Sequence, residues 1–200
     1  NPSIIYACAA DPSSNLLNVY QSTDRGNSWT VIGPGGTLAF SPLSNIIGNS
    51  LFGQGDYDNA LGVAPNNPYK LFLGGSQLWT WDGGQWLHTG CEYCWAQSSY
   101  YIHADKHIFV FDPTNPNIMY FGSDGGVTKS YNQGVTFVTS NKNYNVTQFY
   151  SVAVDPNGYV MGGTQDNGTQ YITGRTVNSV NDPQFAVEVS GGDGGFTAIS

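Results

Sequence analysis

The sequence predicts an all-β protein built from repeated four-stranded antiparallel units. Short apolar runs rich in Val, Ile, Phe, Tyr and Trp alternate with turns of Gly, Asn, Asp and Pro along the 200 residues. No stretch keeps the 3.6-residue apolar spacing of an amphipathic helix for long enough to form one. A pattern of strand, proline turn and strand also recurs at a nearly constant interval, which indicates a repeat architecture.

The repeat is clearest in the strand that follows the turn. This strand reads NPSIIYACA from Asn1, NPYKLFLGG from Asn67, NPNIMYFGS from Asn115 and, more loosely, DPNGYVMGG from Asp155. The strand before the turn reads ALGVAPNNP, HIFVFDPTNP and YSVAVDPNG in the last three copies. We therefore predict units at about residues 1–33, 57–90, 103–140 and 148–190, the first without its innermost strand. Residues 193–200 would begin a further unit or supply that missing strand.

A second pattern, S-x-D-x-G-x-x-W, marks the turn between the two outer strands of a unit. In such a turn the Asp side chain accepts backbone N–H groups, the glycine takes a positive φ, and the aromatic ring packs between sheets. The full copy consists of Ser22, Asp24, Gly26 and Trp29. A second copy, with Asn and Phe in place of Asp and Trp, consists of Ser130, Asn132, Gly134 and Phe137. A shortened copy begins at Thr80 and continues with Asp82, Gly84 and Trp86.

On these residues the chain resembles the Asp-box, or bacterial neuraminidase repeat, β-propellers, a family that includes sialidases, xyloglucanases and the sortilin ectodomain. The resemblance implies four-stranded blades that fan around an axis. We expect a partial propeller of about four blades from a larger ring and chain, the alternative being a closed four-bladed ring. The run from HADKH to GGDGG is similar to sortilin-like and glycosyl-hydrolase-like secreted bacterial proteins. This similarity implies an extracellular or cell-surface location.

Charge and cysteine content narrow the function. A formal charge of −8 and a pI near 4.4 argue against binding to nucleic-acid phosphates. No apolar run approaches the roughly 20 residues that span a bilayer. Cys91 and Cys94 form a single C-x-x-C pair without the second pair of a zinc site, so we expect a local disulfide or two free thiols. Cys8 has the surroundings of an ordinary strand residue.

Blade geometry predicts where the polar residues gather. The start of an innermost strand and the end of its antiparallel neighbour lie on one face, which would bring His103, Asp105 and His107 beside Asp124. The same reasoning places further carboxylates at this mouth of the channel, namely Asp56, Asp58, Asp166 and Asp193.

Two functions suit such an acidic rim. One is a binding or scaffold module for a glycan or protein ligand, with His103, His107, Asp58 and Trp95 as contacts. The other is a glycoside hydrolase that uses a pair from Asp105, Asp124, Asp166 and Asp193, with Trp79, Trp81 or Trp95 as sugar platforms. We favour binding. Sialidase activity is disfavoured, because only Arg25 and Arg175 are available for the arginine triad that holds sialic acid.

A bound cation is a further expectation for the rim. Residues four apart on an extended strand are about 13 Å apart, so His103 and His107 share an ion only if the chain bends. Asp105, His107 and Asp124 form the more plausible ligand set. Such oxygen-rich ligation suits Ca²⁺, Mg²⁺ or another divalent cation better than zinc.

Overall fold

The computed structural model describes residues 3–95, 97–141, 146–172, 176–177, 180–181 and 186–199. Every regular element among these residues is a β-strand. The chain forms two compact units, residues 1–141 and 142–200, which we describe separately. No helix long and apolar enough to cross a membrane occurs in the described part of the chain. Arg175, one of the two arginines considered above, falls outside the described residues.

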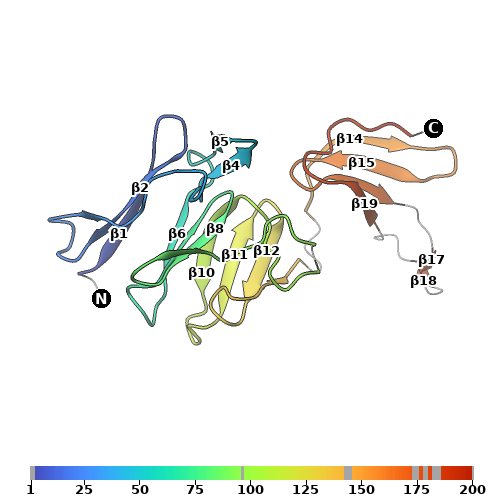
Figure 1. Ribbon diagram of the computed structural model, residues 1–200. Helices are drawn as coiled ribbons and strands as arrows, with labels where there is room; N and C mark the ends of the chain where they lie inside the picture. The colour runs from blue at the N-terminus through green and yellow to red at the C-terminus, as the bar shows by residue number, and fades with distance from the viewer. Residues whose placement is uncertain are drawn as a thin grey trace. The chain divides into compact units, whose positions relative to one another are not determined.

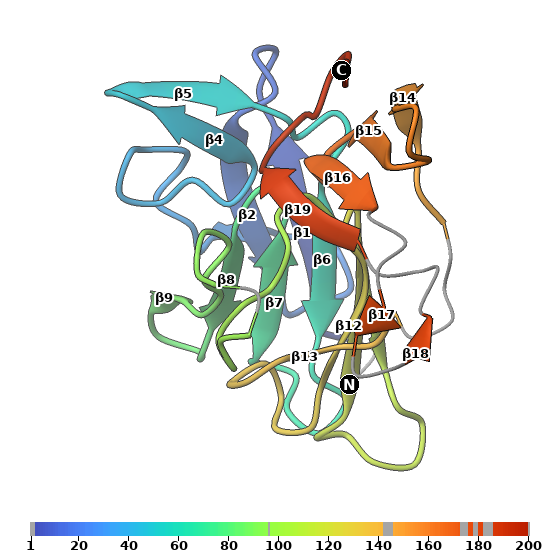
Figure 2. The ribbon, with the colours of Figure 1, turned by 90° about the vertical axis from the view of Figure 1, so that its right-hand side faces the viewer.

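The first sheet of the N-terminal unit has three strands. It consists of β1 (Ile5–Ala10), β2 (Leu16–Ser22) and β3 (Thr30–Val31), each antiparallel to the next. A hairpin that the repeat did not predict follows it, made of β4 (Ser44–Ile47) and β5 (Ser50–Gly53). Figure 2 shows this hairpin in cyan, as a two-stranded element separate from the blades.

The next two sheets are complete four-stranded meanders (Figure 1). One contains β6 (Ala60–Val63), β7 (Leu71–Gly74), β8 (Leu78–Trp81) and β9 (Trp86–His88). The other contains β10 (Lys106–Phe111), β11 (Met119–Ser123), β12 (Gly126–Ser130) and β13 (Val138–Thr139). In both, each strand pairs antiparallel with its successor, which is the topology of a propeller blade.

Neighbouring blades of the N-terminal unit pack face to face. The innermost strands β6 and β10 lie side by side, although they belong to different sheets. The core between these blades contains Phe72, Ile102 and Phe121, all fully buried. Gly74 permits the close approach, because a Cβ there would lie 2.5 Å from Cζ of Phe109 in the next blade. The sheets therefore stack in the blade-on-blade manner of a β-propeller.

The predicted outer turns share one hydrogen-bond pattern in two of their three copies. The Oγ of Ser22 contacts Asp24 Oδ1 at 2.8 Å and accepts the N–H of Gly26 at 2.8 Å. Ser130 makes the equivalent contacts at 3.0 and 2.9 Å. Gly26 and Gly134 both have positive φ, as predicted. Phe137 is buried at 3% exposure as expected, whereas Trp29 is 45% exposed and does not pack between two described sheets.

The shortened copy of this turn corrects one expectation. Asp82 Oδ1 accepts the N–H groups of Gly84 and Gln85 at 2.9 and 2.8 Å, as an Asp in a tight turn does. The glycine with positive φ is Gly83 rather than Gly84. Thr80 Oγ1 contacts Thr89 across the sheet instead of the turn Asp.

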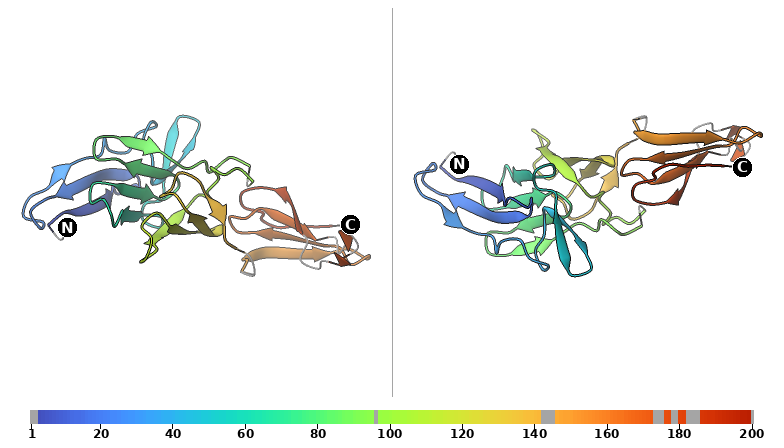
Figure 3. Two further views of the ribbon diagram at one scale, coloured as in Figure 1. Left: turned by 90° about the horizontal axis from the view of Figure 1, so that it is seen from below. Right: turned by 90° about the horizontal axis from the view of Figure 1, so that it is seen from above.

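The C-terminal unit contains one further four-stranded sheet, drawn in orange to red in Figure 3. Its strands are β14 (Phe149–Val154), β15 (Val160–Thr164), β16 (Thr169–Ile172) and β19 (Ala186–Ser190), with a short β17 (Thr176–Val177) and β18 (Val180–Asn181) pair before the last. Residues 191–199 form no regular strand, which corrects the expectation of an innermost strand there. The Thr197 N–H still donates to Ser151 Oγ at 2.7 Å, so this segment lies along β14.

Candidate functional site

The site begins with an irregularity in the innermost strand of the third sheet. Lys106 pairs with Ser123 and Ile108 with Gly122, so His107 is an extra residue between them and forms a β-bulge. A bulge re-aims a side chain relative to the regular pleat. Tyr150 has the same place in β14, and both residues stand five positions before an Asp-Pro pair. The bulge is therefore a feature that two blades share.

His107 lies between two aspartates from different blades. Its Nε2 is 2.7 Å from Oδ1 of Asp124, which follows β11 in the same sheet. Its Nδ1 is 3.3 Å from Oδ1 of Asp58, which precedes β6 of the neighbouring blade. The ring of Tyr57 meets the imidazole edge-on, with ring centroids 4.9 Å apart. The predicted juxtaposition of His107 and Asp124 is thus present, and Asp58 joins it.

Asp105 completes an acidic cluster, which we define as Asp58, Asp105, His107 and Asp124. One carboxylate oxygen of Asp105 and one of Asp124 lie within 4.8 Å of each other. Asp105 has a φ of 57°, so the chain turns sharply just before β10. The bend before this strand, which the sequence left open, is therefore present. The turn directs Asp105 inward, where its Oδ1 is buried and its carboxyl is in hydrogen-bonding contact with that of Asp58.

Burial and mutual repulsion control the protonation of the cluster. Burial, and next the charge of Asp105, raise the pKa of Asp58 to about 7. Burial and the charge of Asp124 raise the pKa of Asp105. Burial would lower the pKa of His107, but its hydrogen bond to Asp124 and the charges of Asp124 and Asp58 outweigh this and raise it. The cluster therefore favours positive charge at its centre.

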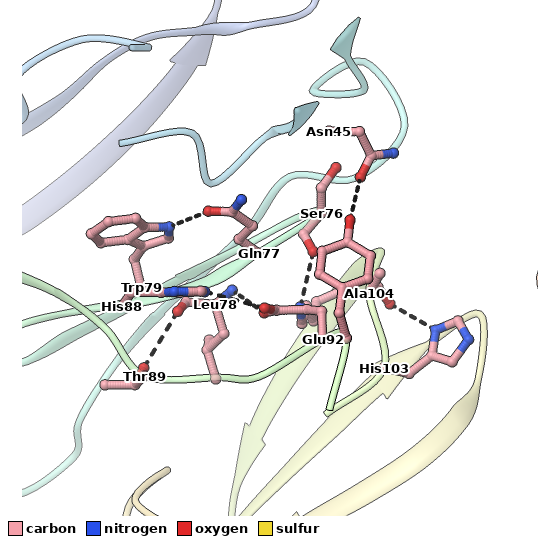
Figure 4. A network of polar contacts seen from close by, with 12 residues as sticks. Asn45, Ser76, Gln77, Leu78, Trp79, His88, Thr89, Glu92, His103 and Ala104 are labelled. Carbon is pink, nitrogen blue, oxygen red and sulfur yellow. Dashed lines mark hydrogen bonds and ion pairs between the residues drawn. The ribbon is translucent and has the colours of Figure 1, made fainter. Parts of the chain in front are cut away.

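A buried ion pair supports the start of β10 from behind. The Nζ of Lys106, which has no exposed surface, donates to Oε1 of Glu92 at 2.8 Å and to the carbonyl of Ser76 at 3.2 Å. Glu92 also accepts the N–H of Leu78 at 2.8 Å, and His88 Nε2 lies 3.1 Å from its other oxygen. Figure 4 shows His88 and Leu78 next to Glu92. The network fixes the residue that directly precedes His107.

Glu92 belongs to a loop that a disulfide closes. Cys91 and Cys94 form a disulfide, so of the two alternatives that the sequence left open, a local disulfide or two free thiols, the structure has the first. Cys8 is a free, half-buried thiol, and burial raises its pKa to about 12. Glu92 points into the protein, while Tyr93 and Trp95 are 78% and 86% exposed. The Tyr93 hydroxyl reaches Asn45 Oδ1 at 3.4 Å. The loop thus presents two aromatic rings to solvent.

The other predicted rim residues of the N-terminal unit are His103 and Asp56. His103 is half-buried, with its Nδ1 3.0 Å from the Ala104 carbonyl, and its ring covers Gly125. Asp56 is exposed. Asp166 and Asp193 belong to the C-terminal unit, where the Asp166 N–H donates to Asp193 Oδ1 at 3.1 Å and the Tyr150 hydroxyl donates to the same oxygen at 3.2 Å. Within that unit they form a polar group around the second bulge.

Sequence reasoning missed three residues of this region: Tyr57, Glu92 and Lys106. Tyr57 directly precedes Asp58, a predicted rim residue, in the segment GDYDNA. An aromatic residue at that position could have been predicted to lie at the rim as well. Lys106 is one of only six basic residues and stands at the start of an apolar strand, where a lysine needs an acidic partner. Nothing in the local sequence identifies Glu92 as this partner, because the tertiary fold brings the two residues together.

Comparison with known proteins does not assign the chain to a family. No protein-family model matches it, and no curated protein sequence matches it. Among solved structures it is similar to a GH74 xyloglucanase from Xanthomonas campestris (15% identity, TM-score 0.48, covering 84% of this chain and 27% of that one). It is also similar to a GH74 enzyme from Niastella koreensis (22%, 0.40, 92% and 24%). A third is PorZ, a surface component of the type-IX secretion system of Porphyromonas gingivalis (15%, 0.44, 94% and 26%). The chain spans about a quarter of the length of these proteins.

Proposed function

We propose that the chain is part of a secreted or cell-surface β-propeller that binds a glycan at the acidic cluster. The observation that carries this proposal is the pairing of an exposed aromatic ring with a locked imidazole. Tyr57 is 62% exposed and packs edge-on against His107, which Asp58 and Asp124 hold from both sides. Sugars combine apolar faces, which stack on such rings, with hydroxyl groups, which donate to carboxylates.

Two further features support this assignment. The side chain of Asp124 is 16% exposed and that of His107 is 32% exposed, so polar acceptor and donor atoms both reach solvent. The disulfide between Cys91 and Cys94 is typical of proteins that fold outside the cytosol, where glycans of the cell surface are encountered. A net charge of −8 favours neutral or cationic glycans over acidic ones.

Glycoside hydrolysis is the second candidate, and the proximity of Asp105 and Asp124 favours it. Their carboxylate oxygens lie within 4.8 Å, near the separation of about 5–5.5 Å used by retaining enzymes. A hydrolase also needs a protonated acid in contact with the glycosidic oxygen. The carboxyl that holds its proton near neutral pH is Asp58, which has no exposed surface. We therefore rank binding above hydrolysis.

The experiment is a binding and hydrolysis screen of the intact protein against a panel of neutral polysaccharides, by affinity electrophoresis and reducing-sugar assay. We expect retarded migration with at least one glycan and no release of reducing ends. Tyr57→Ala should weaken binding at least about 10-fold, because it removes the apolar platform. Tyr131→Ala is the matched control, since Tyr131 is 58% exposed on the turn between β12 and β13.

The outcomes separate the candidates. Retention that Tyr57→Ala and Tyr131→Ala reduce equally would argue against binding at the cluster. Hydrolysis by the parent that disappears in Asp124→Asn would establish the enzyme instead. If hydrolysis were lost in Asp166→Asn but kept in Asp124→Asn, the catalytic carboxylate would belong to the C-terminal unit.

A further inference from the structure

The atoms around His107 have the spacing of ligands on a single ion. One oxygen each from Asp58 and Asp124 and one ring nitrogen of His107 all lie within 4.8 Å of one another. Ligand atoms about 2.1–2.3 Å from one cation are about 3 Å apart when adjacent and up to about 4.5 Å when opposite. The 2.7 Å between His107 Nε2 and Asp124 Oδ1 is close to the adjacent spacing. All three residues belong to the N-terminal unit.

The carboxylate of Asp58 is the observation that points to a ligand. Its side chain has no exposed surface, and neither of its oxygens accepts a hydrogen bond from an N–H or hydroxyl group of the described residues. The side chain in hydrogen-bonding contact with it is another carboxyl, that of Asp105. His107 Nδ1 lies at an ion-pair distance of 3.3 Å from its Oδ1. A buried carboxylate without donors carries a large desolvation cost. Its charge must be neutralised by a proton or by a cation.

The neighbouring ammonium group is directed elsewhere. Lys106 Nζ donates its hydrogen bonds to Glu92 and to the Ser76 carbonyl rather than to Asp58. The partly exposed side chains of His107 and Asp124 give an ion a route from solvent to Asp58. An ion there would also neutralise Asp105, whose carboxyl is in hydrogen-bonding contact with that of Asp58.

We propose that Asp58, His107 and Asp124 bind one divalent cation of the Mn²⁺ type. Ca²⁺ and Mg²⁺ prefer all-oxygen ligand sets, whereas an imidazole nitrogen shifts preference toward first-row transition metals. Two carboxylates with one imidazole suit Mn²⁺, which accepts both kinds of donor. This set differs from the one expected from the sequence, because Asp58 of the neighbouring blade replaces Asp105. The ion would join the two blades at their inner ends.

The test is titration of Mn²⁺ into the metal-free chain, followed by the electron paramagnetic resonance signal of the free ion. We expect saturable loss of that signal with one ion bound per chain. Asp58→Asn should weaken binding by about 10-fold or more, because it removes a buried anionic ligand. Asp56→Asn is the matched control, since it removes the same charge from the same loop at an exposed position and should change affinity less than about threefold.

A folding defect in Asp58→Asn would not end the test, because His107→Gln alters the exposed ligand and should weaken binding by a similar factor. Equal Mn²⁺ affinity in wild type, Asp58→Asn and His107→Gln would overturn the proposal, as would an absence of saturable binding. Displacement of Mn²⁺ by equimolar Ca²⁺ but not by Zn²⁺ would overturn the nitrogen-containing ligand set. The proposal shares its residues with the proposed glycan site, but Mn²⁺ binding is measured without glycan. Failure of either proposal therefore leaves the other standing.

Discussion

Replacement of Glu92 by Gln tests whether the site depends on the buried ion pair behind it. The substitution keeps the shape of the side chain but leaves the ammonium of Lys106 without its counter-ion in a position that has no exposed surface. Breaking one partner of a buried pair typically costs about 3–5 kcal/mol. We expect a loss of about 3 kcal/mol, at the low end, because the Ser76 carbonyl still accepts from Nζ at 3.2 Å.

The pKa of Glu92 gives the same magnitude independently. Burial alone would raise this pKa, but the His88 hydrogen bond and the charge and hydrogen bond of Lys106 lower it from 4.5 to about 2. A difference of that size corresponds to about 3 kcal/mol. Burial also lowers the pKa of Lys106, which offsets part of this gain. Since the folded-state pKa is depressed, the stabilisation is present above pH 4.5 and is lost as the pH falls through about 2.

The assay is urea unfolding followed by tryptophan fluorescence. All five tryptophans lie in the N-terminal unit, so the signal reports that unit alone. We expect the difference in the free energy of unfolding between wild type and Glu92→Gln to be present at pH 7 and to become smaller as the pH falls toward 2. The double variant Glu92→Leu/Lys106→Met should lose less than Glu92→Gln, because no unpaired charge remains. A difference in unfolding free energy below about 1 kcal/mol at pH 7, or a difference that is unchanged at pH 2, would refute the reasoning.

Three further predictions concern the same unit. In the presence of a metal chelator, Asp58→Asn should melt at a higher temperature than wild type, by a difference that grows from pH 4 to pH 7 and then levels off. The reason is that the pKa of Asp58 is raised in the folded state, so wild type loses stability as the pH rises over that range. A difference in melting temperature that does not change with pH would contradict this. Gly134→Ala should lower the urea midpoint more than Gly83→Ala, since both have positive φ but only the first would place a Cβ 3.0 Å from Phe72; equal shifts would contradict it. Substitution of both cysteines of the CEYC loop by Ser should cost about 2 kcal/mol in urea unfolding, as expected for so short a closed loop; no loss would show that the loop is held by Glu92 alone.

Much of the fold follows from local sequence. The proline turns recur at regular intervals, and turn chemistry is decided within a few residues, so strand positions and blade order were predictable. The bounds 57–90 and 103–140 enclose the two complete blades of the N-terminal unit. The contact between His107 and Asp124 also follows, because antiparallel pairing places the start of one strand beside the end of the next.

The details that shape the site do not follow from local sequence. The bulge at His107 depends on how β10 meets β11, and the turn at Asp105 places a non-glycine residue at positive φ, which the surrounding packing must enforce. The pairing of Glu92 with Lys106 joins a disulfide loop to a strand 14 residues later. The fully buried position of Asp58 depends on the stacking of one blade on the next. Each of these features is set by tertiary packing.

The central claim is that the cluster around His107 is a ligand-binding site. Its most direct test is long-range ¹H–¹⁵N NMR of the histidine side chains. The metal-free chain is titrated with oligosaccharides prepared from whichever polysaccharide retards its migration in affinity electrophoresis. The chain has only three histidines, so each ring can be followed separately. We predict a saturable shift of the His107 ring nitrogens, with His88, held by Glu92, unchanged. Failure of every oligosaccharide to bind, or binding that leaves the His107 signals in place, would contradict the account.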